Sequence, residues 1–284
     1  MKLNYSLIKI KNEISRISKI RTESEPIDKI ERELKPLLKG FWTEFFGRPD
    51  NKFELYRARK GEHNHIKELW YPNPKYVKKL GRMNKRSESI FYTSCGHNAK
   101  LGCLEETRVK KGEIITRLKC ELDSTELKLL GLGNFDEWME DKIKKSERSS
   151  MNIYLELFNK NKKEQKNRIG NKHENKKNDE IKKWINALFF KKISEEKEHK
   201  YSHTIAISKN YFDGFKCDGI FFPSIASYGR SINLSLKPKI ADNYVSPLKV
   251  QVLEILDITN EGYKLKLKKE SKEIRENGEI IWSW

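Results

Sequence analysis

The sequence predicts a protein that combines α-helices with β-strands, and two patterns carry this prediction. Near the N-terminus, apolar residues recur at helical spacing along charged segments. Further along, short runs alternate between apolar and polar residues or are rich in β-branched and aromatic side chains, as strands are. The chain of 284 residues is long enough for one large domain or two small ones with a sizeable core.

Composition limits the classes of partner. Only 36% of the residues are apolar and 35% are charged, so long parts of the chain must be solvated. The net charge of +18 favours polyanions such as nucleic acid, or an acidic protein, as partners. Charge alone is a weak signal, because lysines spread over a surface mainly keep a protein in solution.

The four cysteines show no paired spacing, so we expect reduced thiols in a cytoplasmic protein. No apolar run approaches the length of a membrane span, and the first residues do not form a signal peptide, so no membrane partner is expected. His63, His65, Cys95 and His97 lack the paired spacing of metal ligands, and we predict no metal site.

Two helices are predicted in residues 1–50, which we assign to an N-terminal helical region. Ser24–Pro26 ends the first helix and begins the second. The apolar stripes of the two helices are Ile10, Ile14, Ile17 and Ile20, and Ile27, Ile30, Leu34 and Leu38. Such a pair packs on its own domain; a partner-binding or dimerising arm is the alternative.

The first predicted strand, Phe53–Arg59, places Arg57 and Arg59 on the same face as its apolar residues. Two arginines on an apolar strand need a carboxylate or a phosphate, or they must lie at the rim of the sheet. A polar turn, Gly81–Asn84, then leads into a strand at Ser89–Thr93. A guanidinium fixed in such a turn can bind an anion through its planar fork of donors, so Arg82 is a candidate anion clamp. From this stretch alone, a solvated arginine on a hairpin turn is the favoured interpretation.

The rest of the chain alternates between predicted elements and polar segments. Pro223 ends one strand and leaves Ser224 at the mouth of that strand. Asn277–Gly278 predicts the turn of a C-terminal β-hairpin. Ordered structure is expected to resume at His203–Ile207 after the polar segment, and Gly229–Leu236 is predicted as a loop followed by a strand. The remaining predicted helices are Leu101–Arg108, Met151–Phe158 and Ile181–Phe190, and the remaining strands are Glu113–Cys120, Glu126–Leu130, the run of Asp218–Ile225 that Pro223 ends, Leu248–Leu256, Tyr263–Leu267 and Ile280–Trp284.

Residues 159–179 are almost entirely Lys, Asn, Glu and Gln, and we expect a mobile basic insertion there. The segment Lys160–Asn178 offers too little apolar surface to order itself. A basic hairpin that clamps nucleic acid is the alternative, but it lacks the interleaved aromatic residues that stack on bases.

Six motifs, taken in order, resemble the RES-domain family, which is named for an Arg, a Glu and a Ser. Each motif is weak alone, but chance matches would not keep this order. They predict a RES domain at 51–247, with residues 248–284 completing it. The motifs are Tyr56–Arg59, Gly81–Asn84, Ile90–Ser94, Glu106–Arg108, Asp218–Ser224 and Gly229–Leu236.

The resemblance implies an α+β fold like that of ADP-ribosyltransferases, with a split, strongly curved sheet around an NAD+ cleft. Many members are toxins of toxin–antitoxin pairs, restrained by an Xre-type antitoxin, and act by destroying NAD+ through hydrolysis or phosphorolysis or by attaching ADP-ribose to a protein. We therefore expect an NAD+ glycohydrolase or phosphorylase, with a mono-ADP-ribosyltransferase as the alternative and NAD+ as substrate. A basic nucleic-acid-binding module on a degenerate RES fold stays open, as does a homo-oligomer.

The resemblance also suggests roles for site residues. Arg82 and Arg57 would grip the pyrophosphate of NAD+. Glu106 would stabilise the positive charge that builds on the ribose, and Tyr92 would stack on nicotinamide or ribose. Ser224 would hydrogen-bond the carboxamide or hold Glu106. The expected catalytic set is Glu106, Tyr92 and Arg82, and the NAD+-binding set adds Arg57, Arg59, Asn84, Ser224 and Asn233.

Three of these assignments have competitors. Glu105 is the other candidate acid; Glu106 is preferred because Glu-x-Arg followed by Gly112 matches the spacing in the family. Arg59 is the alternative to Arg57 as the binder. Tyr92 would, in most proteins, be a core aromatic residue with a satisfied hydroxyl.

Overall fold

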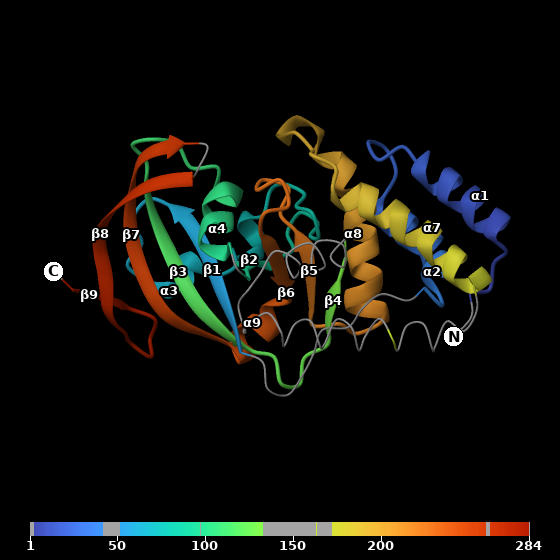
Figure 1. The fold of residues 1–284 in the computed structure, drawn as a ribbon. Coiled ribbons are helices and arrows are strands. Elements are labelled where there is room, and N and C mark those ends of the chain that lie inside the picture. Colours follow the sequence, from blue (N-terminus) through green and yellow to red (C-terminus); the bar gives the residue numbers. More distant parts are fainter. Residues whose placement is uncertain are drawn as a thin grey trace. The chain divides into compact units, whose positions relative to one another are not determined.

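The computed structural model describes residues 3–41, 52–96, 98–132, 163, 172–259 and 262–283. The predicted helix at Met151–Phe158, residues 159–162 and 164–171 of the predicted insertion, and His97 lie outside this description. The chain divides into two compact units, each built from segments far apart in sequence (Figure 1). The first unit is Met1–Phe46, Lys78–Arg86 and Lys128–Pro223, and the second is Gly47–Val77, Ser87–Leu127 and Ser224–Trp284. The units cut across the predicted ranges 1–50, 51–247 and 248–284.

Helices dominate the first unit. α1 (Leu7–Ser18) packs against α7 (Lys172–Phe189), and α2 (Ile27–Leu38) packs against α8 (Ser202–Lys209). The predicted N-terminal stripes point inward: Ile10, Ile17, Ile30 and Leu34 are fully buried. Burial of these side chains stabilises a unit whose helices are otherwise polar, since each contributes about 1.5–3 kcal/mol.

α8 gives the type of an element that the sequence left open, because His203–Ile207 is helical. Every residue from Ser202 to Ser208 is buried. A short apolar run buried on all sides shows no amphipathic pattern, so periodicity cannot separate a helix from a strand there.

α7 corrects the extent of the predicted insertion, because the helix begins at Lys172 and not at Ile181. Glu174 and Lys177 are both buried and pair with each other at 2.6 Å. Glu174 also accepts a hydrogen bond of 3.2 Å from the main-chain N–H of Leu3. The ion pair between Glu174 and Lys177 and the hydrogen bond from Leu3 to Glu174 thus order this polar stretch. Burial of apolar side chains alone could not order it.

The first unit also contains a short parallel strand pair. β4 (Leu129–Gly131) pairs with β5 (Gly219–Pro223), all of whose residues are buried. The connecting helices of this unit are η2 (Glu195–Tyr201) and η3 (Asn210–Gly214).

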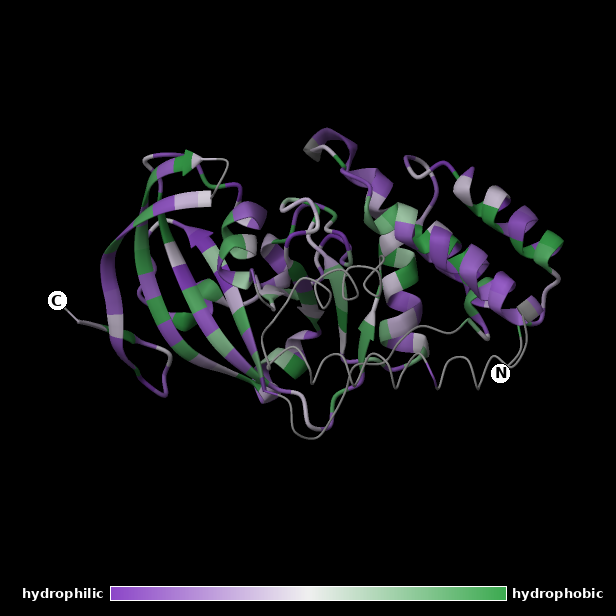
Figure 2. Cartoon of the chain, viewed as in Figure 1, coloured by the Kyte–Doolittle hydropathy of each residue, from purple (hydrophilic) through white to green (hydrophobic). Residues whose placement is uncertain are grey.

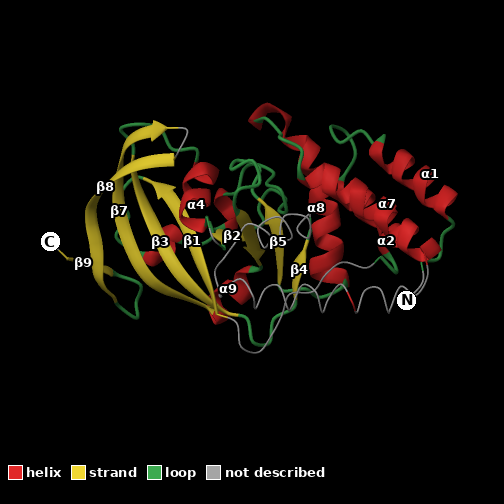
Figure 3. Ribbon diagram, in the orientation of Figure 1, coloured by secondary structure: helices red, strands yellow, loops and turns green. Residues whose placement is uncertain are grey.

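The second unit is built on an antiparallel sheet whose strands run in the order β6-β2-β1-β3-β7-β8-β9. β7 and β8 are long and curved (Figure 3). Hydrophobic and hydrophilic residues alternate along β3 and β7 (Figure 2), which follows from the two-residue period of a strand. The strands are β1 (Lys52–Lys60), β2 (Phe91–Cys95), β3 (Ile114–Asp123), β6 (Ile232–Leu236), β7 (Val245–Thr259), β8 (Gly262–Ile274) and β9 (Ile280–Ser283).

Helices border this sheet. α4 (Ala99–Thr107) packs against β1 and β2, and Tyr56, Cys103 and Leu104 lie in one buried cluster. The shorter helices of the unit are α3 (Ile66–Leu69), η1 (Pro74–Tyr76) and α9 (Pro238–Tyr244). The chain thus mixes helix and strand as predicted, with antiparallel pairing throughout this unit.

The sheet opens between β1 and β2. These two described strands pair only at Leu55–Cys95 and Tyr56–Ser94, whereas β1 pairs with β3 from Lys52 to Lys60. Beyond Tyr56, β1 and β2 no longer pair, and the Arg57 side chain donates to the Tyr92 carbonyl instead.

None of the helices in the described part of the chain is long and apolar enough to span a bilayer.

The predicted C-terminal hairpin is confirmed, with β8 and β9 antiparallel around Asn277–Gly278. Gly278 has a φ of 89°, and a Cβ there would lie 2.6 Å from the ring of His65. That ring accepts a hydrogen bond from the N–H of Lys67, so it cannot move away without cost.

We predict that Gly278→Ala lowers the free energy of unfolding by about 2–4 kcal/mol, the sum of left-handed strain and overlap. Gly112→Ala is the matched control, because Gly112 has a φ of 81° but open space around it. The control should lose only about 1–2 kcal/mol. Urea denaturation measures the free energy of unfolding of both variants. Equal losses would mean that His65 moves aside at no cost in stability.

Candidate functional site

α4 carries the predicted acidic residues against β6 and β2. Gly102, near its middle, permits a close approach: a Cβ there would lie 2.3 Å from Oγ of Ser231 and 3.2 Å from Oγ of Ser94. Glycine inside a helix costs about 1 kcal/mol relative to alanine, and the contact with these serines explains its presence. Glu106 lies one turn further along and therefore comes close to the same two strands.

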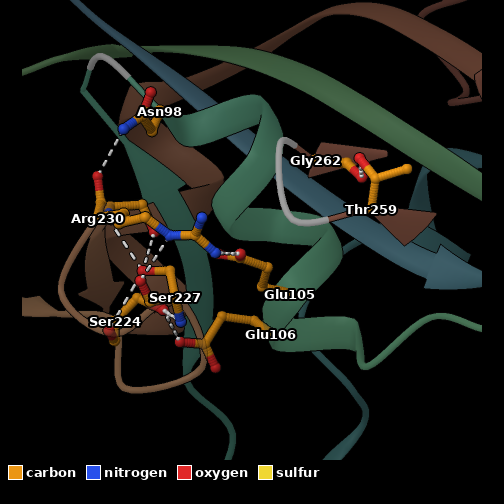
Figure 4. Close-up of polar contacts among 9 residues, drawn as sticks. Asn98, Glu105, Glu106, Ser224, Ser227, Arg230, Thr259 and Gly262 are labelled. Atoms are coloured by element: carbon orange, nitrogen blue, oxygen red, sulfur yellow. Dashed lines mark hydrogen bonds and ion pairs between the residues drawn. The ribbon is translucent and has the colours of Figure 1, made fainter. Parts of the chain in front are cut away.

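Glu106 is held by two donors on one oxygen. Ser224 Oγ and Asn233 Nδ2 each donate to Oε1 of Glu106 at 2.6 Å (Figure 4 shows the carboxylate beside Ser224). In the part of the chain that the structure describes, Oε2 has no hydrogen-bond partner, and Glu106 is exposed. One carboxylate oxygen is thus fixed and the other is presented to solvent.

The amide of Asn233 is itself oriented. Ser94 Oγ donates to its Oδ1 at 3.0 Å, so Nδ2 must face Glu106. Ser94 and Asn233 are directly opposite each other in the β2–β6 pair, and Tyr92 lies opposite Ser235 in the same register. Because side chains alternate along a strand, Tyr92 shares the sheet face of Asn233 and Glu106.

The loop 224–231 fixes Ser224. Its ends are joined by the N–H of Ser224, which donates to the carbonyl of Ser231 at 3.0 Å. Ser227 donates its N–H to Ser224 Oγ at 3.1 Å, and its own Oγ accepts from the N–H and the hydroxyl of Ser231 at 3.0 and 2.9 Å. All three serines are buried. The hydroxyl that holds Glu106 therefore belongs to a closed network.

Glu105 has a different environment from its neighbour. Its carboxylate forms an ion pair with Arg230, and its side chain is only 8% exposed. Burial raises the pKa of Glu105, and the guanidinium of Arg230 opposes that rise. Of the two candidate acids, Glu106 is the exposed one, and it is the one that Ser224 and Asn233 hold.

Arg57 and Arg59 border the opening between β1 and β2. Arg57 donates to the carbonyls of Leu69, at 2.8 Å, and Tyr92, and Arg59 donates to the carbonyl of Trp70 at 2.7 Å. Neither arginine forms an ion pair within the described segments, and Nε of Arg59 is buried without a partner there. Burial, followed by repulsion from Arg59, lowers the pKa of Arg57 to about 9. Burial also lowers the pKa of Arg59, and the charge of Glu68 opposes that fall. These two cations are desolvated without an ion-pair partner among the described residues, which favours an incoming anion.

Alternation along β1 sets these arginines apart from the acid. Tyr56 faces α4, so Arg57 and Arg59 lie on the other face of the strand. The structure records no contact between either arginine and Glu106. Ser224 and Asn233 contact Glu106 directly. Tyr92 lies on the same face of the sheet as these residues, whereas Arg57 and Arg59 lie on the opposite face.

Arg82 and Asn84 belong to the first unit. Arg82 donates to the carbonyl of Phe189 at 2.6 Å, and its guanidinium lies 5.3 Å from the ring centre of Tyr201. Thr204 Oγ1 donates to the carbonyl of Arg82 at 2.7 Å. Asn84 is buried and donates to the carbonyl of Lys85 at 2.9 Å. Arg82 is thus a fixed, half-buried guanidinium that pairs with no carboxylate in the described part of this unit.

Several residues of the Glu106 site had no predicted role. Ser94, Ser227, Ser231 and Arg230 support the residues that hold or flank the acid. Ser224, Ser227 and Ser231 lie close together in the sequence, with Gly229 between the last two. Serine hydroxyls in such a segment often bond to its own main chain, so this spacing could have predicted a closed loop. For Gly102, the signal was a glycine within a predicted helix.

A carboxylate with one clamped and one free oxygen can bind a hydroxyl, stabilise a developing cation, or move a proton. The chain matches no protein-family model, no curated protein and no solved structure. The chemistry of the site therefore rests on the geometry of its own residues.

We predict that Gly102→Ala lowers the free energy of unfolding by about 1–3 kcal/mol, because the added methyl group meets Ser231. Ser231→Gly removes both overlapping atoms. The double variant Gly102→Ala/Ser231→Gly should therefore lose less than the sum of the two single variants in urea denaturation. Additive losses would show that α4 does not depend on this close approach.

Proposed function

We propose that this chain is an enzyme that cleaves NAD+ at the bond between nicotinamide and ribose. The observation that carries the proposal is the carboxylate of Glu106, held at 2.6 Å by both Ser224 and Asn233 with its second oxygen free. The three residues come from three separate motifs of the RES-domain resemblance. Their meeting at one oxygen supports a common functional site.

The chemistry asks for such a carboxylate. As the C–N bond to nicotinamide breaks, its electron pair leaves with the neutral nicotinamide ring and positive charge develops on the ribose. Oε2 of Glu106 would stabilise this charge and hold a ribose hydroxyl. Because Oε1 is already bound, the carboxylate needs no reorganisation as the charge develops. Water, phosphate or a protein side chain would then bond to the ribose carbon.

Tyr92 and the arginines would bind the rest of NAD+. Tyr92 lies on the sheet face of Glu106, where its ring would stack on nicotinamide or ribose. The RES-domain resemblance gives the pyrophosphate to Arg82, a fixed guanidinium without a carboxylate partner among the described residues. Arg57 lies on the face of β1 opposite Glu106, and its guanidinium contacts the Tyr92 carbonyl.

The opening of the sheet between β1 and β2 and the curved β7 and β8 support an ADP-ribosyltransferase-like arrangement in the second unit. On this proposal the chain is a toxin-like NAD+ glycohydrolase or phosphorylase. Transfer of ADP-ribose to a protein differs only in the acceptor that reaches the ribose. Product identification with and without phosphate separates these outcomes.

We predict that Glu106→Gln lowers the rate of nicotinamide release about 100-fold to 1,000-fold. The dissociation constant for NAD+ should change by less than about threefold, because the amide keeps the shape and loses only the charge that the transition state needs. Nicotinamide release and calorimetric titration with NAD+ measure the two quantities.

Glu62→Gln is the matched control, since Glu62 is an exposed acid of the same unit that pairs with Lys269. It should leave both quantities unchanged. Turnover of Glu106→Gln at the parent's rate would overturn the assignment of Glu106.

We predict the opposite pattern for Arg82→Ala. Charge-assisted hydrogen bonds to the pyrophosphate act in both the ground state and the transition state, so binding of NAD+ should weaken about 10-fold to 100-fold. The rate at saturating NAD+ should fall much less. The same titration and rate assays test this, and unchanged affinity would place the pyrophosphate elsewhere.

A further inference from the structure

The loop 224–231 is attached to α4 at more points than the acid site requires. Ser224 joins it to Glu106, while Arg230 joins it to Glu105 (Figure 4). The carbonyl of Arg230 also accepts a hydrogen bond of 2.8 Å from Asn98, the residue that precedes α4. A single loop residue therefore contacts α4 at both of its ends.

We propose that Arg230 is a positioning residue, which sets the orientation of Glu106 through the loop and through Glu105. The inference rests on the proposed function for its kinetic readout. Arg230 itself bonds to neither Ser224 nor Glu106, so its effect has to pass through these neighbours.

The first route is the loop. Nε of Arg230 donates to the carbonyl of Ser227 at 3.1 Å, and Ser227 donates its N–H to Ser224 Oγ at 3.1 Å. Arg230 also directly precedes Ser231, the residue that α4 approaches at Gly102. Loss of the guanidinium would leave the loop bonded to Asn98 but able to move relative to Glu105 and the C-terminal end of α4. Ser224 would then fix Oε1 of Glu106 less firmly.

The second route is charge. Glu105 and Glu106 are adjacent at the C-terminal end of α4, where the helix dipole disfavours negative charge. Oε2 of Glu105 is buried and has no partner among the described residues. The charged and titratable groups that act on Glu105 are Arg230 from the loop, Glu106 on its own helix and Tyr263 on β8. Arg230 is the cation of this group, so its removal leaves two carboxylates without compensation.

The ion pair itself contributes little to stability. Arg230 is 47% exposed and the Glu105 side chain only 8%, so water reaches the pair from the side of Arg230. With this screening the pair is worth about 1 kcal/mol. A small misplacement of a catalytic group, in contrast, costs up to about 100-fold in rate. Position, rather than stability, is therefore the property that Arg230 should control.

The test compares Arg230→Met, Arg230→Lys and a matched control, Arg275→Met. Arg275 forms an exposed pair with Glu279 in the same unit, away from α4. Arg230→Met should lower kcat about 10-fold to 100-fold and change KM for NAD+ by less than about twofold. Arg230→Lys, which keeps a positive charge for Glu105 but loses the Nε donor to Ser227, should recover only part of the lost kcat. Arg275→Met should match the parent.

A second readout does not depend on activity. The side-chain amide signals of Asn233 in ¹H–¹⁵N spectra report its hydrogen bond to Glu106, and they should shift in Arg230→Met but not in Arg275→Met. Unchanged kcat and unchanged amide signals in Arg230→Met would overturn the inference, as would parallel loss of kcat and of the folded state. If the parent releases no nicotinamide, the proposed function fails, and the amide signals alone decide on Arg230.

Discussion

The hydrogen bonds to one oxygen of Glu106 are the constraint on which the second unit depends. Ser224 and Asn233 lie on different segments, and both reach Oε1 at 2.6 Å, so the loop, β6 and α4 must all keep their positions. Gly102 makes this arrangement sterically feasible. This arrangement lowers the stability of α4. Glu105 and Glu106 both lie at the C-terminal end of the helix, where the helix dipole disfavours negative charge, and the Glu105 side chain is only 8% exposed. Features that oppose stability are concentrated in this way at functional sites.

Three arginines carry positive charges that no ion pair compensates in the described part of the chain. Arg57, Arg59 and Arg82 donate to main-chain carbonyls and pair with no carboxylate in the segments that the structure describes. Surface lysines of the second unit behave differently: Lys52 pairs with Glu121 and Lys60 pairs with Glu113. Acids are thus present, but in those segments these three guanidinium groups form no ion pair with them, and Glu68 only opposes the effect of burial on the pKa of Arg59. Fixed cations without an ion-pair partner fit a protein that binds an anionic substrate.

Local sequence signals predicted most elements of the fold, because their periods were clear. The stripes of α1 and α2, the alternation of β1 and the Asn277–Gly278 turn each describe a face or a turn that one segment defines alone. The helical type of α8 was not predicted because burial on all sides removes any period. The start of α7 was missed because its order depends on Glu174 pairing with Lys177. The preference for Glu106 over Glu105 came from motif spacing. That Arg57 and Glu106 lie on opposite faces of the sheet was not predictable, because it depends on strand register. The contacts of Arg230 with both ends of α4 were not predictable either, because they depend on a loop that folds back onto the helix.

Direct product analysis tests the central claim, that the Glu106 site cleaves NAD+. The purified chain of 284 residues is incubated with NAD+ in buffer with and without inorganic phosphate, and all products are separated and identified by mass. The account predicts free nicotinamide in an amount equal to the NAD+ lost, together with ADP-ribose, its phosphorylated form when phosphate is present, or ADP-ribose attached to protein. NAD+ that remains intact after prolonged incubation, with the chain folded and Ser224, Asn233 and Glu106 in contact, would contradict it.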